Sequence, residues 1–219
     1  MVMTNNGTLK SVRIGVLVLG LFAVAATGLV VLVHTLTHER VIANERAAVL
    51  RSLFALVPQT QIDNDLYNDV VEVRDPELLG SSSPVKVFRA RKSGQPVAAI
   101  FNVVAPDGYS GPIALLVAVD VKGGVLGVRV VSHKETPGLG DKIDERRTPW
   151  VRGFEQKDLQ NPSLQGGWAV RRDGGVFDQF SGATITPRAV VKAVKNALVY
   201  YSKHRDELFA APNVQEIAQ

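Results

Sequence analysis

The 219-residue chain contains no cysteine. It therefore cannot form a disulfide, a thiolate metal site, an iron–sulfur centre with the usual ligands or a cysteine nucleophile. It also lacks a block of one charge: the formal net charge is +4, and the Lys and Arg residues are dispersed. Because nucleic-acid binding needs a concentrated basic surface, we expect no nucleic acid among the partners. Hydrophobic residues make up 46% of the chain, enough for the core of one domain after an N-terminal segment.

Charge is absent from one long stretch, Ile14 to Val33. As a helix, this run of about 20 residues spans roughly 30 Å, the thickness of a bilayer core. It predicts a transmembrane helix over residues 14–36. A cleavable signal peptide is the alternative, with Lys10 and Arg13 as its basic flank and Ala23-Val24-Ala25 as its cleavage site. The apolar run continues well past that site, which favours a membrane anchor.

The chain after this run reads as an α+β fold, with an antiparallel sheet and flanking helices. Residues 38–57 show a second helical pattern, which continues from the membrane helix or packs beneath the domain, and which Pro58 ends. Apolar runs separated by turn signals predict the strands Val85–Arg91, Val97–Ala105, Ile113–Val121 and Val125–Val131, with short ones at Trp168–Arg171 and Val176–Phe177. A helix from Thr186 to about His204 closes the domain.

These elements predict five parts in chain order. They are an N-terminal tail (1–13), the transmembrane helix (14–36), a connecting helix and loop (37–82), a folded domain (83–205) and a C-terminal tail (206–219).

The most informative motif is Asp178-Gln-Phe-Ser-Gly-Ala-Thr184, at the predicted start of the last helix. Thr186 fits the N-cap position and Pro187 the first helical position. A helix N-terminus exposes unpaired N–H groups and attracts phosphate, and Gly182 can approach a ligand closely. Thr184 would then present its hydroxyl where a phosphate settles. An ordinary strand-to-helix turn would use the same residue types.

Two further glycine-containing segments precede this motif. One is the loop Glu135-Thr136-Pro137-Gly138-Leu139-Gly140, which can lay its amides and Leu139 against a flat ring; the other is Gly108-Tyr109-Ser110-Gly111. The first of these loops has the order of neither a dinucleotide-binding fingerprint nor a P-loop, so Rossmann binding is not expected there.

The three segments together resemble those of FMN-binding domains. Asp178 to Thr184 is similar to the flavinylation motif Asp-x-x-Ser/Thr-Gly-Ala-Thr, in which FMN is joined through its phosphate to the last threonine. The Glu-Thr-Pro-Gly-Leu-Gly loop and the Gly-Tyr-x-Gly segment of that family have counterparts here, in the same order. With one membrane segment ahead of them, the chain resembles the G subunits of Rnf electron-transport complexes. The C subunit of the sodium-pumping NADH:quinone reductase is a close relative.

This resemblance implies a covalent FMN cofactor on Thr184, installed by a separate flavin transferase. Thr184 would be an attachment point, so we expect no catalytic residue in the chain. Asp178 and Ser181 are candidates for recognition by the transferase, and Lys142 or Arg188 could neutralise the phosphate. The other residues implied to contact the cofactor are Gly182, Ala183, Thr186, Glu135, Thr136, Gly138, Leu139, Gly108 and Tyr109.

The resemblance also implies a function and a location. The chain would relay electrons among other subunits of a complex that couples electron transfer between NADH and ferredoxin to Na⁺ or H⁺ transport. It would lie in the bacterial inner membrane with its FMN domain on the periplasmic face. The positive-inside rule weakly favours the opposite orientation, because two basic residues, Lys10 and Arg13, precede the span and three follow it, at Arg40, Arg46 and Arg51. The quinone-reductase subunit, which is usually longer, and a membrane-anchored FMN sensor or scaffold without electron relay remain alternatives.

Histidine offers little evidence of other chemistry. His34 and His38 have the i, i+4 spacing of paired ligands, but no third ligand follows at the expected spacing, so we expect no metal site. His133 has no accompanying nucleophile motif, which argues against a hydrolase.

Overall fold

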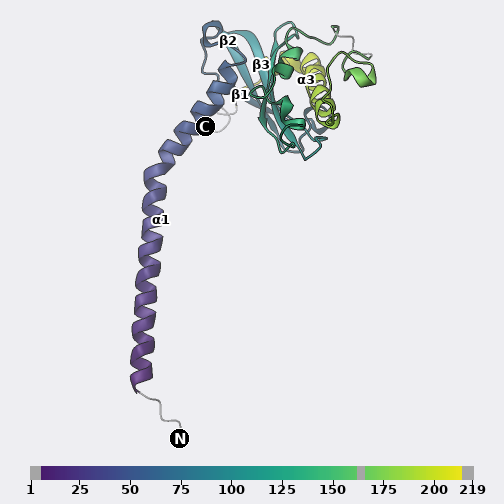
Figure 1. Cartoon of the computed structure of the whole chain (residues 1–219). Helices are drawn as coiled ribbons and strands as arrows, with labels where there is room; N and C mark the ends of the chain where they lie inside the picture. The colour runs from purple at the N-terminus through teal and green to yellow at the C-terminus, as the bar shows by residue number, and fades with distance from the viewer. Residues whose placement is uncertain (1–5, 162–165, 214–219) are drawn as a thin grey trace. The chain divides into compact units, whose positions relative to one another are not determined.

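The computed structural model describes residues 6–161 and 166–213 (Figure 1). It divides into two compact units, Met1–Ala48 and Val49–Gln219, and each is described by itself.

The first unit is formed by the helix α1 (Asn6–Phe54), which runs on into the start of the second unit. Its most apolar 18-residue window has a mean hydropathy of 2.8, and none of that window is buried. Apolar side chains such as Leu17 and Leu19 are more than 70% exposed. By length and composition α1 can cross a membrane, and its exposed apolar surface matches lipid rather than water. The patterns predicted at 14–36 and 38–57 thus belong to one helix, which ends at Phe54, ahead of Pro58.

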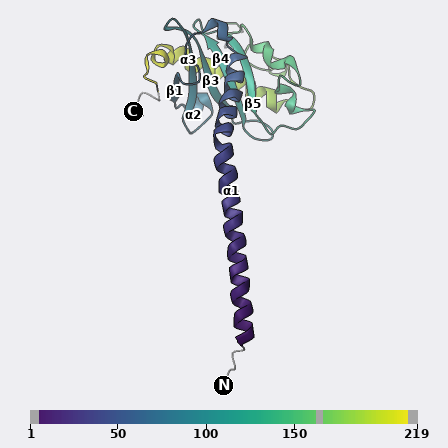
Figure 2. The same cartoon turned by 90° about the vertical axis from the view of Figure 1, so that its left-hand side faces the viewer.

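The second unit is built on a five-stranded antiparallel sheet in the order β1-β2-β3-β4-β5 (Figure 2). Its strands are β1 (Val70–Val73), β2 (Val85–Lys92), β3 (Gln95–Ala105), β4 (Ile113–Asp120) and β5 (Val125–Ser132). The four long strands coincide with the predicted runs, and the α+β class is confirmed. The tight turns follow local chemistry: Gly123 has φ 92°, and Asp120 accepts hydrogen bonds from the amides of Lys122 and Gly124.

Hydrophobic cores lie on both faces of this sheet. On one face the helix α3 (Ile185–Ala210) packs Val190 and Val194 against strand residues such as Phe101. On the other face Leu53 and Val57 pack with a cluster from the alternate strand positions, among them Phe88, Ile100 and Leu116. Because successive strand residues point to opposite faces, the nearly continuous apolar strands reflect burial on both sides.

The other helical elements of the second unit are short. They are α2 (Pro76–Leu79) and the 3-10 helices η1 (Gln59–Gln61), η2 (Gly140–Ile143), η3 (Pro149–Phe154) and η4 (Arg171–Asp173). The short strands predicted around Asp173 are wrong: a single bridge joins Val170 to Phe177. Aromatic packing holds this region instead, since the Phe177 ring stacks on Phe154 at 4.6 Å.

Candidate functional site

Thr184 lies at the junction between a tight turn and α3. In the turn, the Ala183 amide donates to the Phe180 carbonyl (3.1 Å), and Gly182 has φ 79°, a value that favours glycine. Thr184 itself is the N-cap residue, with no side-chain capping bond. The predicted cap at Thr186 is therefore wrong, and α3 begins two residues earlier than expected. Pro187 is tolerated there because first-turn amides have no intrahelical partner.

The backbone amides of Thr184, Ile185 and Thr186 are unpaired in the described parts of the chain. The first amide bonded within this turn is that of Arg188, which donates to the Thr184 carbonyl at 3.4 Å. Thr184 is half-buried, and its hydroxyl has no hydrogen-bond partner among the same residues. A phosphate on that hydroxyl would lie beside free N–H donors at the positive end of a 26-residue helix.

Glu135 connects the three sequence motifs. Its side chain is only 4% exposed. Oε2 accepts a hydrogen bond from the Thr186 hydroxyl (2.5 Å), and Oε1 accepts one from the Ser110 amide (3.0 Å). The Glu135 amide donates to His133 Nδ1 (3.1 Å). Three segments far apart in sequence thus meet at one carboxylate, which we call the Glu135 bracket (Ser110, Glu135 and Thr186).

Glycines allow this close approach. A Cβ on Gly140 would lie 2.6 Å from Glu135 Oε2 and 2.8 Å from the Thr186 hydroxyl oxygen, so a side chain there would displace the bracket. A Cβ on Gly108 would collide with the Gly111 carbonyl oxygen. The glycines of both predicted segments therefore have a steric role beside the site.

Three exposed, largely apolar side chains belong to the segments that meet at the bracket. Tyr109 is next to Ser110, Ile185 is next to Thr186, and Leu139 lies 3.4 Å from where a Cβ on Gly182 would be. All three are at least 40% exposed. We call them the apolar rim; a flat, largely apolar ring linked to Thr184 could pack against such a surface.

The remaining predicted residues lie on the surface near the turn. Thr136, Gly138 and Ser181 are exposed, and Ala183 is half-buried. The Asp178 side chain is exposed and pairs with Arg171 (Nε to Oδ1, 2.7 Å).

Trp150 contacts the backbone of the motif Asp178–Thr184, a role that the sequence did not indicate. Its Nε1 donates to the Asp178 carbonyl at 2.8 Å, and its ring contacts those of Phe154 and Phe180, each with centroids 5.3 Å apart. The indole thus fixes the backbone entering the turn by a contact between residues far apart in the chain.

Two cations are candidates to balance a phosphate at this site. Arg188 is bound through two nitrogens to the Asp173 carboxylate, at 2.5 and 2.6 Å. This hydrogen bonding lowers the pKa of Asp173 and raises the pKa of Arg188. Lys142, in η2, forms no ion pair within residues 6–161 and 166–213 and so keeps its charge available.

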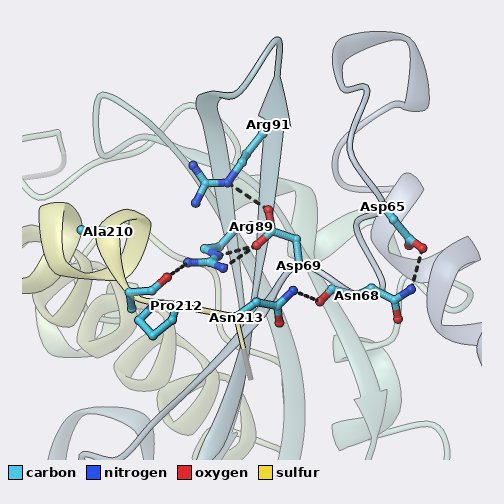
Figure 3. A pocket seen from close by; sticks show the side chains of 9 residues that line it. Asp65, Asn68, Asp69, Arg89, Arg91, Ala210, Pro212 and Asn213 are labelled. Carbon is cyan, nitrogen blue, oxygen red and sulfur yellow. Dashed lines mark hydrogen bonds and ion pairs between the residues drawn. The ribbon is translucent and has the colours of Figure 1, made fainter. Parts of the chain in front are cut away.

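A cavity of about 460 Å³ lies at the other end of α3 from Thr184 (Figure 3). Its arginines, Arg89 and Arg91, both bind Asp69, and Arg89 Nη1 also donates to the carbonyls of Leu208 and Ala211. The two arginines thus share one carboxylate and cap the C-terminal end of α3, where cations are favourable. The cavity contains none of the motif residues, and its charges already serve to hold the helix.

Comparison with known proteins agrees with the motifs. Residues 3–56 match the RnfG N-terminal region, and residues 108–199 match the FMN-binding domain.

The chain is 49% identical over 203 residues to the G subunit of the ion-translocating oxidoreductase complex of Pseudomonas aeruginosa strain UCBPP-PA14, covering 93% of this chain and 94% of that protein. It is 50% identical over 196 residues to the corresponding protein of Aliivibrio fischeri strain ES114, covering 90% and 93%. The resemblance to Rnf G subunits is thereby confirmed, and the chain belongs to the family of G subunits of ion-translocating oxidoreductase complexes, with an apolar N-terminal helix and an FMN-binding domain.

Proposed function

We propose that this chain is a membrane-anchored electron carrier with FMN attached to Thr184 through a phosphoester. The observation that carries the proposal is the environment of the Thr184 hydroxyl. It has no partner among the described residues, it stands at the N-cap of α3, and unpaired amides flank it. The flavinylation motif ends at this same residue.

Attachment requires an activated flavin phosphate. In the proposed step, Thr184 Oγ1 forms a bond to the phosphorus of the FMN moiety in a flavin adenine dinucleotide. The pyrophosphate P–O bond breaks, adenosine monophosphate leaves, and the hydroxyl proton is released. No described residue accepts a hydrogen bond from the Thr184 hydroxyl as a base would, so a separate flavin transferase is proposed to supply the catalysis. Asp178 and Ser181, both exposed, are available for its recognition.

When bound, the flavin supplies the redox chemistry. The chain's own residues would hold it: the amides of Thr184, Ile185 and Thr186 would bind the phosphate, Lys142 would balance its charge, and the apolar rim would contact the ring. Thr136 and Gly138 stay predicted flavin contacts in the same loop.

The subunit would relay electrons between other subunits of its complex. We propose the Rnf assignment in full: electron transfer between NADH and ferredoxin coupled to Na⁺ or H⁺ transport, in the bacterial inner membrane, with the domain on the periplasmic face. A covalent bond suits that side, where a dissociating flavin would be lost by dilution. The match to the RnfG N-terminal region favours this assignment over the quinone-reductase C subunit.

The test is covalent flavin on the full chain, co-expressed with its transferase. The denatured wild type should fluoresce in a gel and gain the mass of FMN less one water. Thr184→Ala should lose both signals, whereas Thr60→Ala, at an exposed threonine in η1 and outside the motifs, should keep them. A wild type without flavin, or a Thr184→Ala variant that retains it, would refute the proposal. Unchanged electron transfer by a complex assembled with Thr184→Ala would refute the relay.

A further inference from the structure

The Glu135 carboxylate is engaged entirely with the protein. At 4% exposure, it accepts one hydrogen bond at each oxygen, from the Thr186 hydroxyl and the Ser110 amide. Among the described residues it forms no ion pair, but its bond to Thr186 places it at the N-terminal end of α3, where a negative charge is favourable. Because both oxygens already accept a bond from the protein and the side chain is 4% exposed, little of Glu135 is left to contact a flavin directly.

Near the start of α3, Arg188 binds the Asp173 carboxylate, but the residues before it have fewer restraints. Thr184 makes no side-chain cap, and Pro187 has no N–H to donate. Thr186, which could cap a helix, is completely buried, and its hydroxyl donates to Glu135. The side-chain bond from Thr186 therefore ties the first turn of α3 to the loop that begins at Glu135.

The opposite end of α3 is held independently. Arg89 and Arg91 bind the carbonyls of Leu208, Phe209 and Ala211 at the C-terminal end of the helix. Loss of the Glu135 bracket would thus leave the helix in place while removing one restraint on its first turn, next to the N-cap residue Thr184.

We propose that Glu135 is a positioning residue for flavin attachment. By accepting from Thr186 and Ser110, it holds the first turn of α3 in the conformation in which the Thr184 hydroxyl and the free amides face the incoming phosphate. The proposal rests on the proposed function, because it concerns the same attachment step. It predicts that attachment slows when the bracket is broken, even though Thr184 remains.

The experiment measures the rate of flavin attachment to the full chain in detergent. Protein expressed without transferase is mixed with purified transferase and flavin adenine dinucleotide, and covalent flavin is followed by intact mass. Thr186→Val removes the hydroxyl but keeps the shape, and Thr186→Ser restores the donor. Val194→Ala, in the buried face of α3, is the control for lost stability. Because small displacements of a reacting group can slow a reaction by about 100-fold, we expect Thr186→Val to attach flavin about 10- to 100-fold more slowly. Thr186→Ser should remain near the wild-type rate.

A double-mutant cycle assigns the effect to Glu135. If Thr186 acts through Glu135, Glu135→Ala combined with Thr186→Val should be no slower than Glu135→Ala alone. Equal rates for wild type and Thr186→Val, or an equal slowing by Val194→Ala, would overturn the positioning role while leaving attachment to Thr184 intact. A wild type that accepts no flavin would refute the proposed function, and the positioning role with it.

Discussion

Substitutions in a protein core usually lower stability, but replacing Tyr201 by phenylalanine is expected not to. Tyr201 lies in α3 at 2% exposure, with its ring edge-on to Phe101 at 6.1 Å. Its hydroxyl has no hydrogen-bond partner within the described ranges. Burial of the phenol raises the pKa of Tyr201 to about 12, from a usual value of 10.0.

The magnitude follows from these two facts. A buried polar group without a partner costs about 1–3 kcal/mol, so Tyr201→Phe should leave the stability at pH 7 unchanged or raise it by up to that amount. At alkaline pH the unfolded chain loses the Tyr201 proton first, because the folded pKa is the higher one. The contribution of Tyr201 to the free energy of unfolding should therefore fall by roughly 2 kcal/mol between pH 10 and pH 12. The Tyr201→Phe variant has no phenol at this position and should not show this alkaline loss of stability.

The assay is guanidinium unfolding of the full chain in detergent, followed by the fluorescence of Trp150 and Trp168, at pH 7 and in steps through pH 12. The stability difference between Tyr201→Phe and wild type should widen in favour of the variant above pH 10. Tyr109→Phe, at a side chain that is 69% exposed, is the matched control and should not change stability at pH 7. A loss of more than about 1 kcal/mol in Tyr201→Phe at pH 7, or parallel curves from pH 10 to pH 12, would refute the reasoning.

Two further substitutions test the site and the helix anchor. Gly140→Ala places a methyl group 2.6 Å from Glu135 Oε2, so it should slow flavin attachment in the rate assay, whereas Gly153→Ala, with open space around it, should not. Arg89→Met keeps the apolar stem but leaves buried acceptors unpaired, so unfolding measurements should show a loss of about 3–5 kcal/mol. Arg152→Met, at an exposed arginine, should change stability by less than about 0.5 kcal/mol, and equal effects of the two arginine variants would contradict the anchoring role.

Local patterns predicted most of the secondary structure. The uncharged run at Ile14–Val33 predicts the apolar part of α1. Apolar runs separated by turn residues place β2 to β5 almost to the residue, because strand burial and turn formation both depend on residues that are close in the sequence. Predictions were wrong where packing outweighed propensity. Thr186 has a side chain typical of an N-cap, but its hydroxyl donates to Glu135 instead. The segment around Asp173 is held by packed aromatic rings and not by the hydrogen bonds of paired strands.

The sequence by itself determined the membrane helix, the long strands and the motif that ends at Thr184, since each depends on residues within a few positions of one another. Only the tertiary structure decided that Glu135 meets Thr186 across 51 residues, that Trp150 bonds to the Asp178 carbonyl across 28, and that Arg89 caps α3 from 119 residues away. Such pairings depend on how strands and helices are placed by the shared core, and a single sequence carries no local signal for which distant donor reaches which acceptor.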